Sequence, residues 1–192
     1  MTASLFNKNS VALVIIDLQK GIVNRDRVSA PYAAISVVSN AAMLVDACRE
    51  HNIPVILVHV KSTPATALTP DADTIAPMRS QEADWADFVP EMTPKPDDIV
   101  ITKQQWGAFY GTDLDLQLRR RKIDTIILCG ISTNIGVEST ARDAFELGFK
   151  QIFVEDAMTA ASSEEHHHAT NYIFKRMGRV RSTKEILEEI NT

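Results

Sequence analysis

The sequence repeatedly places a short, continuous run of apolar and mostly β-branched residues ahead of a stretch with helical spacing. Runs of this kind are typical of strands that are buried on both faces, as in parallel sheets covered by helices. Their alternation with helical stretches predicts an α/β fold, a three-layer αβα, Rossmann-like arrangement around a mostly parallel sheet. Six strands are expected, at residues 11–16, 55–60, 99–102, 125–128 and 151–156 and, as a short last one, around Val180.

The length of the chain predicts one domain. Its 192 residues, 45% of them hydrophobic, are enough for a sizeable core, and we expect residues 1–192 to form a single domain. Six of the eight prolines fall between residues 62 and 98, where the apolar periodicity breaks down. A long irregular connection inside a compact domain is usually functional, so we interpret it as a lid-like excursion. A surface loop without a function is the alternative.

Charge and hydropathy limit the classes of partner. A formal net charge of −5 argues against nucleic acid or an anionic membrane. No apolar stretch approaches the roughly 20 residues needed to span a bilayer, and residues 1–10 do not read as a signal peptide. The two cysteines, Cys48 and Cys129, suit a reducing compartment, and both lie on predicted core faces. We therefore expect a cytoplasmic protein that acts on a small molecule.

Polar residues end three strands of the predicted sheet. Asp17 follows the first strand, Lys103 ends the third, and the loop Ser132–Gly136 follows the fourth and opens a helix. Right-handed crossovers bring the carboxyl ends of parallel strands to one edge of the sheet, where ligands bind. The first amides of a helix also favour negative charge. The sequence thus predicts a site with an acid, an amine and backbone donors, and with no strong nucleophile among residues 131–140.

The histidines do not predict a metal site. His59 lies inside a strand without a second ligand at a suitable spacing, so we expect its ring to be satisfied in the core or at the sheet edge. His166, His167 and His168 are adjacent in a helix expected at residues 163–177. Neighbouring helical residues point about 100° apart and cannot converge on one ion, so we expect all three to be solvated. We expect no metal and no other cofactor.

The order of the motifs resembles that of a known family. The first strand ends in Asp17-Leu18-Gln19, and Lys103 is followed by Ala-Phe at residues 108–109 and by Gly-Thr-Asp-Leu at 111–114. Residues 129–141 match the pattern Cys-Gly-x-x-Thr-Asn-x-Cys-Val-x-x-Thr-Ala at every specified position except one. These motifs resemble the isochorismatase-like superfamily, also called the cysteine hydrolases, and the resemblance runs from Val11 to the end of the chain.

The exception is Gly136, which stands where the amidases of the family carry the nucleophilic cysteine. In those amidases an aspartate accepts the thiol proton, a lysine stabilises the charged arrangement and loop amides hold the oxyanion. The resemblance assigns these roles to Asp17, to Lys103 and to the loop residues Ser132, Thr133 and Asn134, and it implies a cis peptide at Ile131-Ser132. We expect substrate contacts from Gln19 and from three aromatic residues, Trp106, Phe109 and Tyr110.

A glycine excludes the thioester route of the family, because it has no side chain to acylate. The true isochorismatases resemble this case, since they also lack the cysteine and hydrolyse a vinyl ether with the aspartate as the acid. The leading hypothesis is therefore a hydrolase of a small, carboxylated molecule in which Asp17 and Lys103 assist water. A binding protein that has kept the pocket is the alternative, and a redox role for the two cysteines is weaker. Family members commonly associate, so a homodimer or homotetramer is expected.

Overall fold

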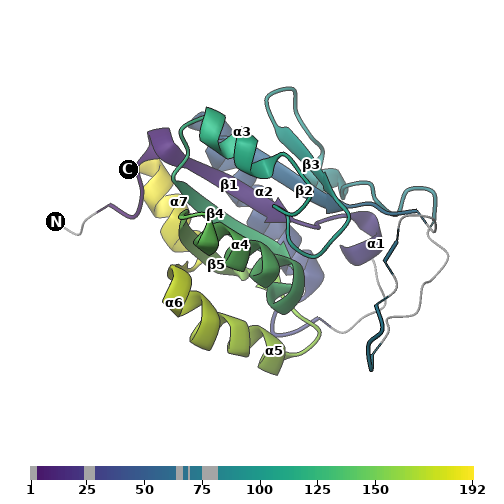
Figure 1. The fold of residues 1–192 in the computed structure, drawn as a ribbon. Helices are drawn as coiled ribbons and strands as arrows, with labels where there is room; N and C mark the ends of the chain where they lie inside the picture. Colours follow the sequence, from purple (N-terminus) through teal and green to yellow (C-terminus); the bar gives the residue numbers. More distant parts are fainter. Residues whose placement is uncertain (1–3, 24–28, 64–66, 69, 75–81) are drawn as a thin grey trace.

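The computed structural model describes residues 4–23, 29–63, 67–68, 70–74 and 82–192. Six strands form one sheet in the order β3-β2-β1-β4-β5-β6 (Figure 1). Every neighbouring pair in this sheet is parallel, so the expected α/β sheet is confirmed and is wholly rather than mostly parallel. The strands are β1 (Val11–Ile16), β2 (Val55–Val60), β3 (Ile99–Lys103), β4 (Thr125–Ile131), β5 (Lys150–Thr159) and β6 (Arg179–Arg181).

Helices cover both faces of the sheet, as the buried strands require. The helices are α1 (Lys20–Val23), α2 (Ala34–Glu50), α3 (Leu114–Arg120), α4 (Glu138–Glu146), α5 (Ser163–His168), α6 (Lys175–Met177) and α7 (Thr183–Asn191). Figure 1 shows α2 and α7 on one side of the sheet and α3, α4, α5 and α6 on the other. None of the helices in the described ranges is both long and apolar enough to cross a membrane.

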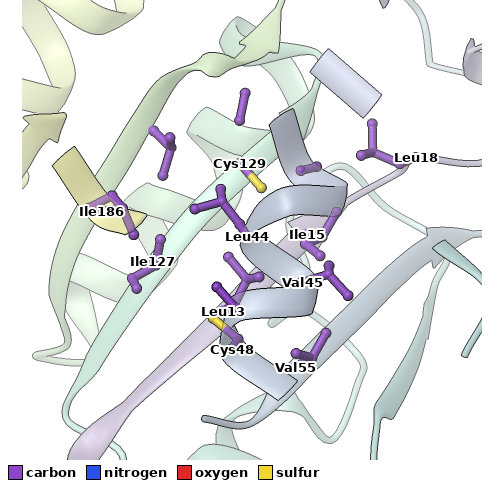
Figure 2. Packing of buried hydrophobic residues seen from close by; sticks show 14 of the residues in the cluster. Leu13, Ile15, Leu18, Leu44, Val45, Cys48, Val55, Ile127, Cys129 and Ile186 are labelled. Atoms are coloured by element: carbon purple, nitrogen blue, oxygen red, sulfur yellow. The ribbon is translucent and has the colours of Figure 1, made fainter. Parts of the chain in front are cut away.

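The core on the α2 side contains both cysteines. Cys48 lies on the buried face of α2 and Cys129 lies in β4, and neither is exposed (Figure 2). Burial raises the pKa of the Cys48 thiol to about 12 and raises that of Cys129 as well. Their burial confirms the expectation that both cysteines are core residues. A buried thiol of this kind is inert.

The strand order places the end of β1 beside the end of β4. This is the point where the order reverses along the sheet, and ligands of open α/β sheets bind there. Gly130 allows the two strands to approach closely, because a Cβ on it would lie 2.1 Å from the carbonyl oxygen of Ile16. Its φ of +121° is also open to glycine but not to residues with side chains. The residues after Ile16 and those after Ile131 therefore lie next to each other.

The proline-rich stretch at residues 62–98 lies partly outside the described residues. Its described end runs antiparallel to the chain that follows β1, with a bridge between Gln19 and Phe88. The amide of Val89 donates to the carbonyl of Leu18, and two further backbone bonds join residues 20–21 to this segment. The segment is therefore docked next to the end of β1, while its role as a lid stays a prediction.

Candidate active site

Asp17 and Lys103 form a buried ion pair at the carboxyl edge of the sheet. Lys103 Nζ lies 2.8 Å from Asp17 Oδ2, and the two side chains are 2% and 7% exposed. The long lysine side chain reaches Asp17 from the edge strand β3, across β2, which lies between β3 and β1. Lys103 Nζ also donates to the carbonyls of Gln105 and Trp106, at 3.2 and 2.9 Å. Two residues that stand 86 positions apart in sequence are thus joined in one charged pair.

The environment of Asp17 makes its carboxylate easier to protonate than a carboxylate in water. Burial raises its pKa to about 6, although the charge and the hydrogen bond of Lys103 oppose that rise. Its Oδ1 atom is buried and has no hydrogen-bond partner among the described residues. The backbone of Asp17 has a φ of +55°, a conformation that aspartate tolerates better than most residues with side chains. Titration close to neutral pH suits a group that transfers protons.

Gly136 lies directly against this pair. A Cβ atom on Gly136 would lie 3.2 Å from Asp17 Oδ2, 3.5 Å from Lys103 Nζ and 3.0 Å from Ile16 Cγ2. A side chain at position 136 would therefore project into the space beside the carboxylate and the ammonium group. All three contacts would be close, so glycine lets the backbone of the loop pack directly against the ion pair.

The loop after β4 presents amides without intrahelical partners. The Ile131-Ser132 peptide is cis, as the resemblance implies. A wide turn at Thr133–Val137 then leads directly into α4, so that Thr133 and Asn134 open a continuous helical segment. The first amides of a helix have no acceptor within it, and the side chain of Ser132 does not cap them. These amides are donors for an anionic group.

The loop is tied down at two points. At its end, Thr140 Oγ1 donates to the carbonyl of Gly136 at 2.7 Å and accepts from the amide of Ala108 at 3.0 Å. At its start, Thr133 Oγ1 is hydrogen-bonded to His166 Nδ1 at 2.9 Å. The Oδ1 atom of Asn134 is buried and without a partner among the described residues, like the Oδ1 atom of Asp17.

The four residues expected to contact substrate lie in different environments from one another. Gln19 is fully buried, and its side chain bonds to the main chain of Val60 and Trp85, so it braces the ends of β1 and β2. The side chains of Trp106 and Tyr110 are largely exposed, and Phe109 stacks on Phe149 just before β5 begins. Trp106 contacts the ion pair through its carbonyl oxygen, which accepts the bond from Lys103 Nζ.

His166 is a component of the site region that the sequence analysis missed. The expectation that all three histidines are solvated is wrong for His166, which is 1% exposed, whereas His167 and His168 are exposed. The 100° turn per residue separates the three rings, and it also points the first of them inward when the helix packs against the protein. A signal was present in the sequence, because His166 shares a helical face with the buried residues Ala169, Thr170 and Phe174.

His59 has partners on both ring nitrogens. Its Nδ1 bonds to the carbonyl oxygen of Ala86 at 2.7 Å and its Nε2 to Thr102 Oγ1 at 2.8 Å, which confirms a satisfied histidine at the sheet edge. Throughout the parts of the chain that the structure describes, no three metal-binding side chains are grouped so that they could hold an ion.

Comparison with known proteins gives one consistent result. The isochorismatase domain profile matches residues 11–185. The uncharacterized isochorismatase family protein YwoC of Bacillus subtilis is 56% identical over 182 residues, 93% of each chain. The uncharacterized isochorismatase family protein YecD of Escherichia coli O157:H7 is 48% identical, over 96% of this chain and 98% of YecD. The structure of an isochorismatase family protein from Burkholderia thailandensis superposes with a TM-score of 0.92 at 41% identity, over 99% of this chain and 100% of that one.

Proposed function

Because the chain belongs to the isochorismatase family, we propose that it hydrolyses a small carboxylated molecule with Asp17 and Lys103 assisting water, without a covalent cysteine intermediate. The observation that carries this proposal is the buried Asp17–Lys103 pair next to a glycine. The pair supplies an acid and a cation. Gly136 places no side chain between them and the loop.

Asp17 has the properties of a general acid. With a pKa of about 6, about a tenth of the molecules carry a protonated Asp17 at pH 7, and the fraction is larger under mildly acidic conditions. Because Lys103 bonds to Oδ2, the proton belongs on Oδ1, the oxygen without a partner. A vinyl ether is the bond type that such an acid suits best, because its hydrolysis begins with protonation of carbon and needs no nucleophilic side chain.

The proposed reaction then proceeds in three steps. Asp17 gives its proton to the terminal vinyl carbon, which leaves an oxocarbenium ion at the carbon that bears the ether oxygen. Water adds to that carbon and returns a proton to the Asp17 carboxylate. The resulting hemiketal releases the alcohol and leaves a ketone, so that one water molecule is consumed and the acid is restored.

Lys103 and the loop amides assist through charge. The ammonium group of Lys103 orients Asp17 and attracts a substrate carboxylate, and its bonds to two carbonyl oxygens hold it in place. The loop that follows β4 begins at this edge of the sheet, and the amides of Thr133 and Asn134, which open its helical segment, are suited to receive a second anionic oxygen. General acid catalysis contributes typically about 10²- to 10⁴-fold, so such electrostatic assistance is needed for a substrate that reacts slowly in water.

The burial of both cysteines argues against either of them as the nucleophile. Cys48 and Cys129 are fully buried in the core on the α2 side of the sheet. Treatment with iodoacetamide should therefore leave turnover intact. Loss of turnover after alkylation, with an unchanged circular dichroism spectrum, would argue for a thiol mechanism.

Substrate screening with variants tests the proposal. Isochorismate, as a vinyl ether, and a panel of small carboxylated amides are incubated with the protein, and products are followed by chromatography and mass spectrometry. We expect product from at least one carboxylated compound. Asp17→Asn should abolish its formation, whereas Asp97→Asn, which alters an exposed carboxylate, should not. Turnover by Asp17→Asn at the wild-type rate refutes the acid role.

A thermal-shift screen of the same compounds separates catalysis from binding. Compounds that raise the melting temperature and are converted support a hydrolase. If several compounds stabilise the protein and none is converted to product, the hydrolase hypothesis is wrong and the protein is a binding protein that has kept the pocket.

A further inference from the structure

The His166 ring is buried between Thr133, at the start of the site loop, and the ring of Tyr32. Its Nδ1 atom is hydrogen-bonded to Thr133 Oγ1 at 2.9 Å, and both residues are almost completely excluded from solvent. On another side the ring meets Tyr32 edge-on, with ring centroids 5.7 Å apart. The carbonyl of Tyr32 accepts a bond from Thr159, the last residue of β5. His166 therefore connects the first residue of the wide turn with the end of a central strand.

The backbone of His166 is held as firmly as its ring. Its amide donates to the carbonyl of Ser162, whose side chain caps α5 by accepting from the amide of Glu165. Its carbonyl accepts from Thr170 Oγ1 at 3.0 Å. A side chain anchored in this way transmits a fixed position to whatever it bonds. Burial lowers the pKa of His166 to about 4, so the ring is neutral near pH 7.

The partner of this ring, Thr133, lies where it can control the direction of the first loop amides. Thr133 opens the helical segment, so its amide and that of Asn134 have no acceptor within the helix. The second side-chain anchor of the loop, between Thr140 and Gly136, lies at the other end of the turn. Rotation about the backbone at Thr133 would redirect its amide while leaving the Gly136 anchor in place.

We propose that His166 is a positioning residue, which acts through the hydroxyl of Thr133 to hold the amides of Thr133 and Asn134 toward Asp17 and Lys103. Its catalytic consequence rests on the proposed function, because the amides must contact an anionic group of the substrate or of the transition state. The positioning itself is a property of the folded protein and can be measured without a substrate.

Two variants remove the hydrogen bond in different ways. His166→Phe keeps an aromatic ring, and Thr133→Val keeps the shape of the threonine. His168→Phe is the matched control, because His168 is an exposed histidine in the same helix. His166→Asn is the rescue variant, since an amide group can occupy the place of Nδ1. Thr133→Val provides the same test if His166→Phe fails to fold.

The first measurement is the backbone amide spectrum of the ¹⁵N-labelled protein. We expect the signals of Thr133 and Asn134 to move and their hydrogen exchange to accelerate by about 10-fold or more in His166→Phe and in Thr133→Val, because the loop is freed locally. His168→Phe should leave both unchanged. Signals and exchange rates that match the wild type in His166→Phe and in Thr133→Val would overturn the proposal, whether or not the protein is an enzyme.

The second measurement is turnover of the substrate found by screening. We expect kcat to fall roughly 10- to 100-fold in each single variant with KM within about 3-fold of the wild type, because misdirected donors weaken binding of the transition state. The double variant should be no slower than the slower single variant, and His166→Asn should recover most of the loss. Additive losses, or equal losses in His168→Phe, would overturn the proposal. Absence of turnover in the wild type would refute the proposed function and leave the amide measurement to decide the positioning.

Discussion

Position 136 permits a test of the close packing between the loop and Asp17. Gly136→Ala adds a methyl carbon 3.0 Å from Ile16 Cγ2 and 3.2 Å from Asp17 Oδ2. Gly136 is not among the glycines with positive φ, so alanine fits its backbone. Alanine is favoured over glycine in a helix by about 1 kcal/mol, whereas crowding in a packed site costs about 1–3 kcal/mol. The free energy of unfolding should therefore fall by no more than about 2 kcal/mol, which leaves a typical domain folded.

The same methyl group should impair turnover much more than stability. It crowds the carboxylate of Asp17, and a displacement of the reacting groups by about 1 Å can cost 10²-fold in rate. We expect kcat/KM of Gly136→Ala to fall by about this factor, measured by steady-state product formation at pH 6. Ser139→Ala, a change of similar size on α4 without a described contact to the ion pair, should be neutral. Wild-type turnover by Gly136→Ala would show that the reaction does not depend on the geometry of Asp17 beside position 136.

Gly136→Cys extends the test to covalent chemistry. The introduced thiol would lie within reach of Asp17 and Lys103, where a neighbouring cation favours the thiolate. We expect a single adduct with iodoacetamide, seen by intact-mass spectrometry, and protection of the thiol by the substrate. The wild type should give no adduct under native conditions, because both of its cysteines are buried. Labelling of Gly136→Cys only after unfolding would refute the inferred access to position 136.

Two further predictions concern pH. Since the pKa of Asp17 is raised to about 6 and its protonated form is the proposed acid, kcat/KM should be highest below pH 6 and fall as the pH rises through 6. Lys103→Met should move this fall in kcat/KM to higher pH, because Lys103 lowers the pKa of Asp17. A wild-type kcat/KM that rises with pH would contradict the acid role. The pKa of His166 is lowered to about 4, so the unfolded chain takes up a proton that the folded protein refuses between about pH 6.5 and 4. Urea unfolding should show that the stability advantage of the wild type over His166→Phe is complete above pH 6.5 and shrinks toward pH 4. A difference in stability that does not change with pH would show that His166 is not buried in the neutral form.

The sequence was sufficient for the strands and for the main pair of the site. Runs such as residues 11–16 and 125–128 are apolar at every position, or nearly so, because both faces of a central parallel strand are covered. Since crossovers in such sheets are right-handed, the residue after β1 and the residue at the end of β3 must meet at one edge. Asp17 and Lys103 could therefore be assigned to one site before any distance was known. The sequence also showed that residue 136 is a glycine without a reactive side chain.

The sequence did not reveal how side chains near that edge are used. Gln19 stands two residues after Asp17, yet its side chain turns to the main chain of Val60, because the ends of β1 and β2 leave backbone groups that need partners. The aromatic residues after Lys103 suggested a pocket wall, but the rings of Trp106 and Tyr110 lie in solvent. The local sequence indicates whether a residue tends to be buried or exposed, but it does not indicate which residues of other elements its side chain will contact.

The sequence by itself determined a parallel α/β domain and the acid, amine and amide loop at its carboxyl edge, because strand burial and crossover handedness act through local pattern and chain order. Only the tertiary structure decided that one histidine of three adjacent ones is buried against Thr133, and that Gly136 packs directly against the ion pair. Both depend on how a helix or loop packs against elements distant in sequence. The bond between Thr133 and His166 joins the loop after β4 to α5, 33 positions away in sequence, so it depends on how these two elements pack together.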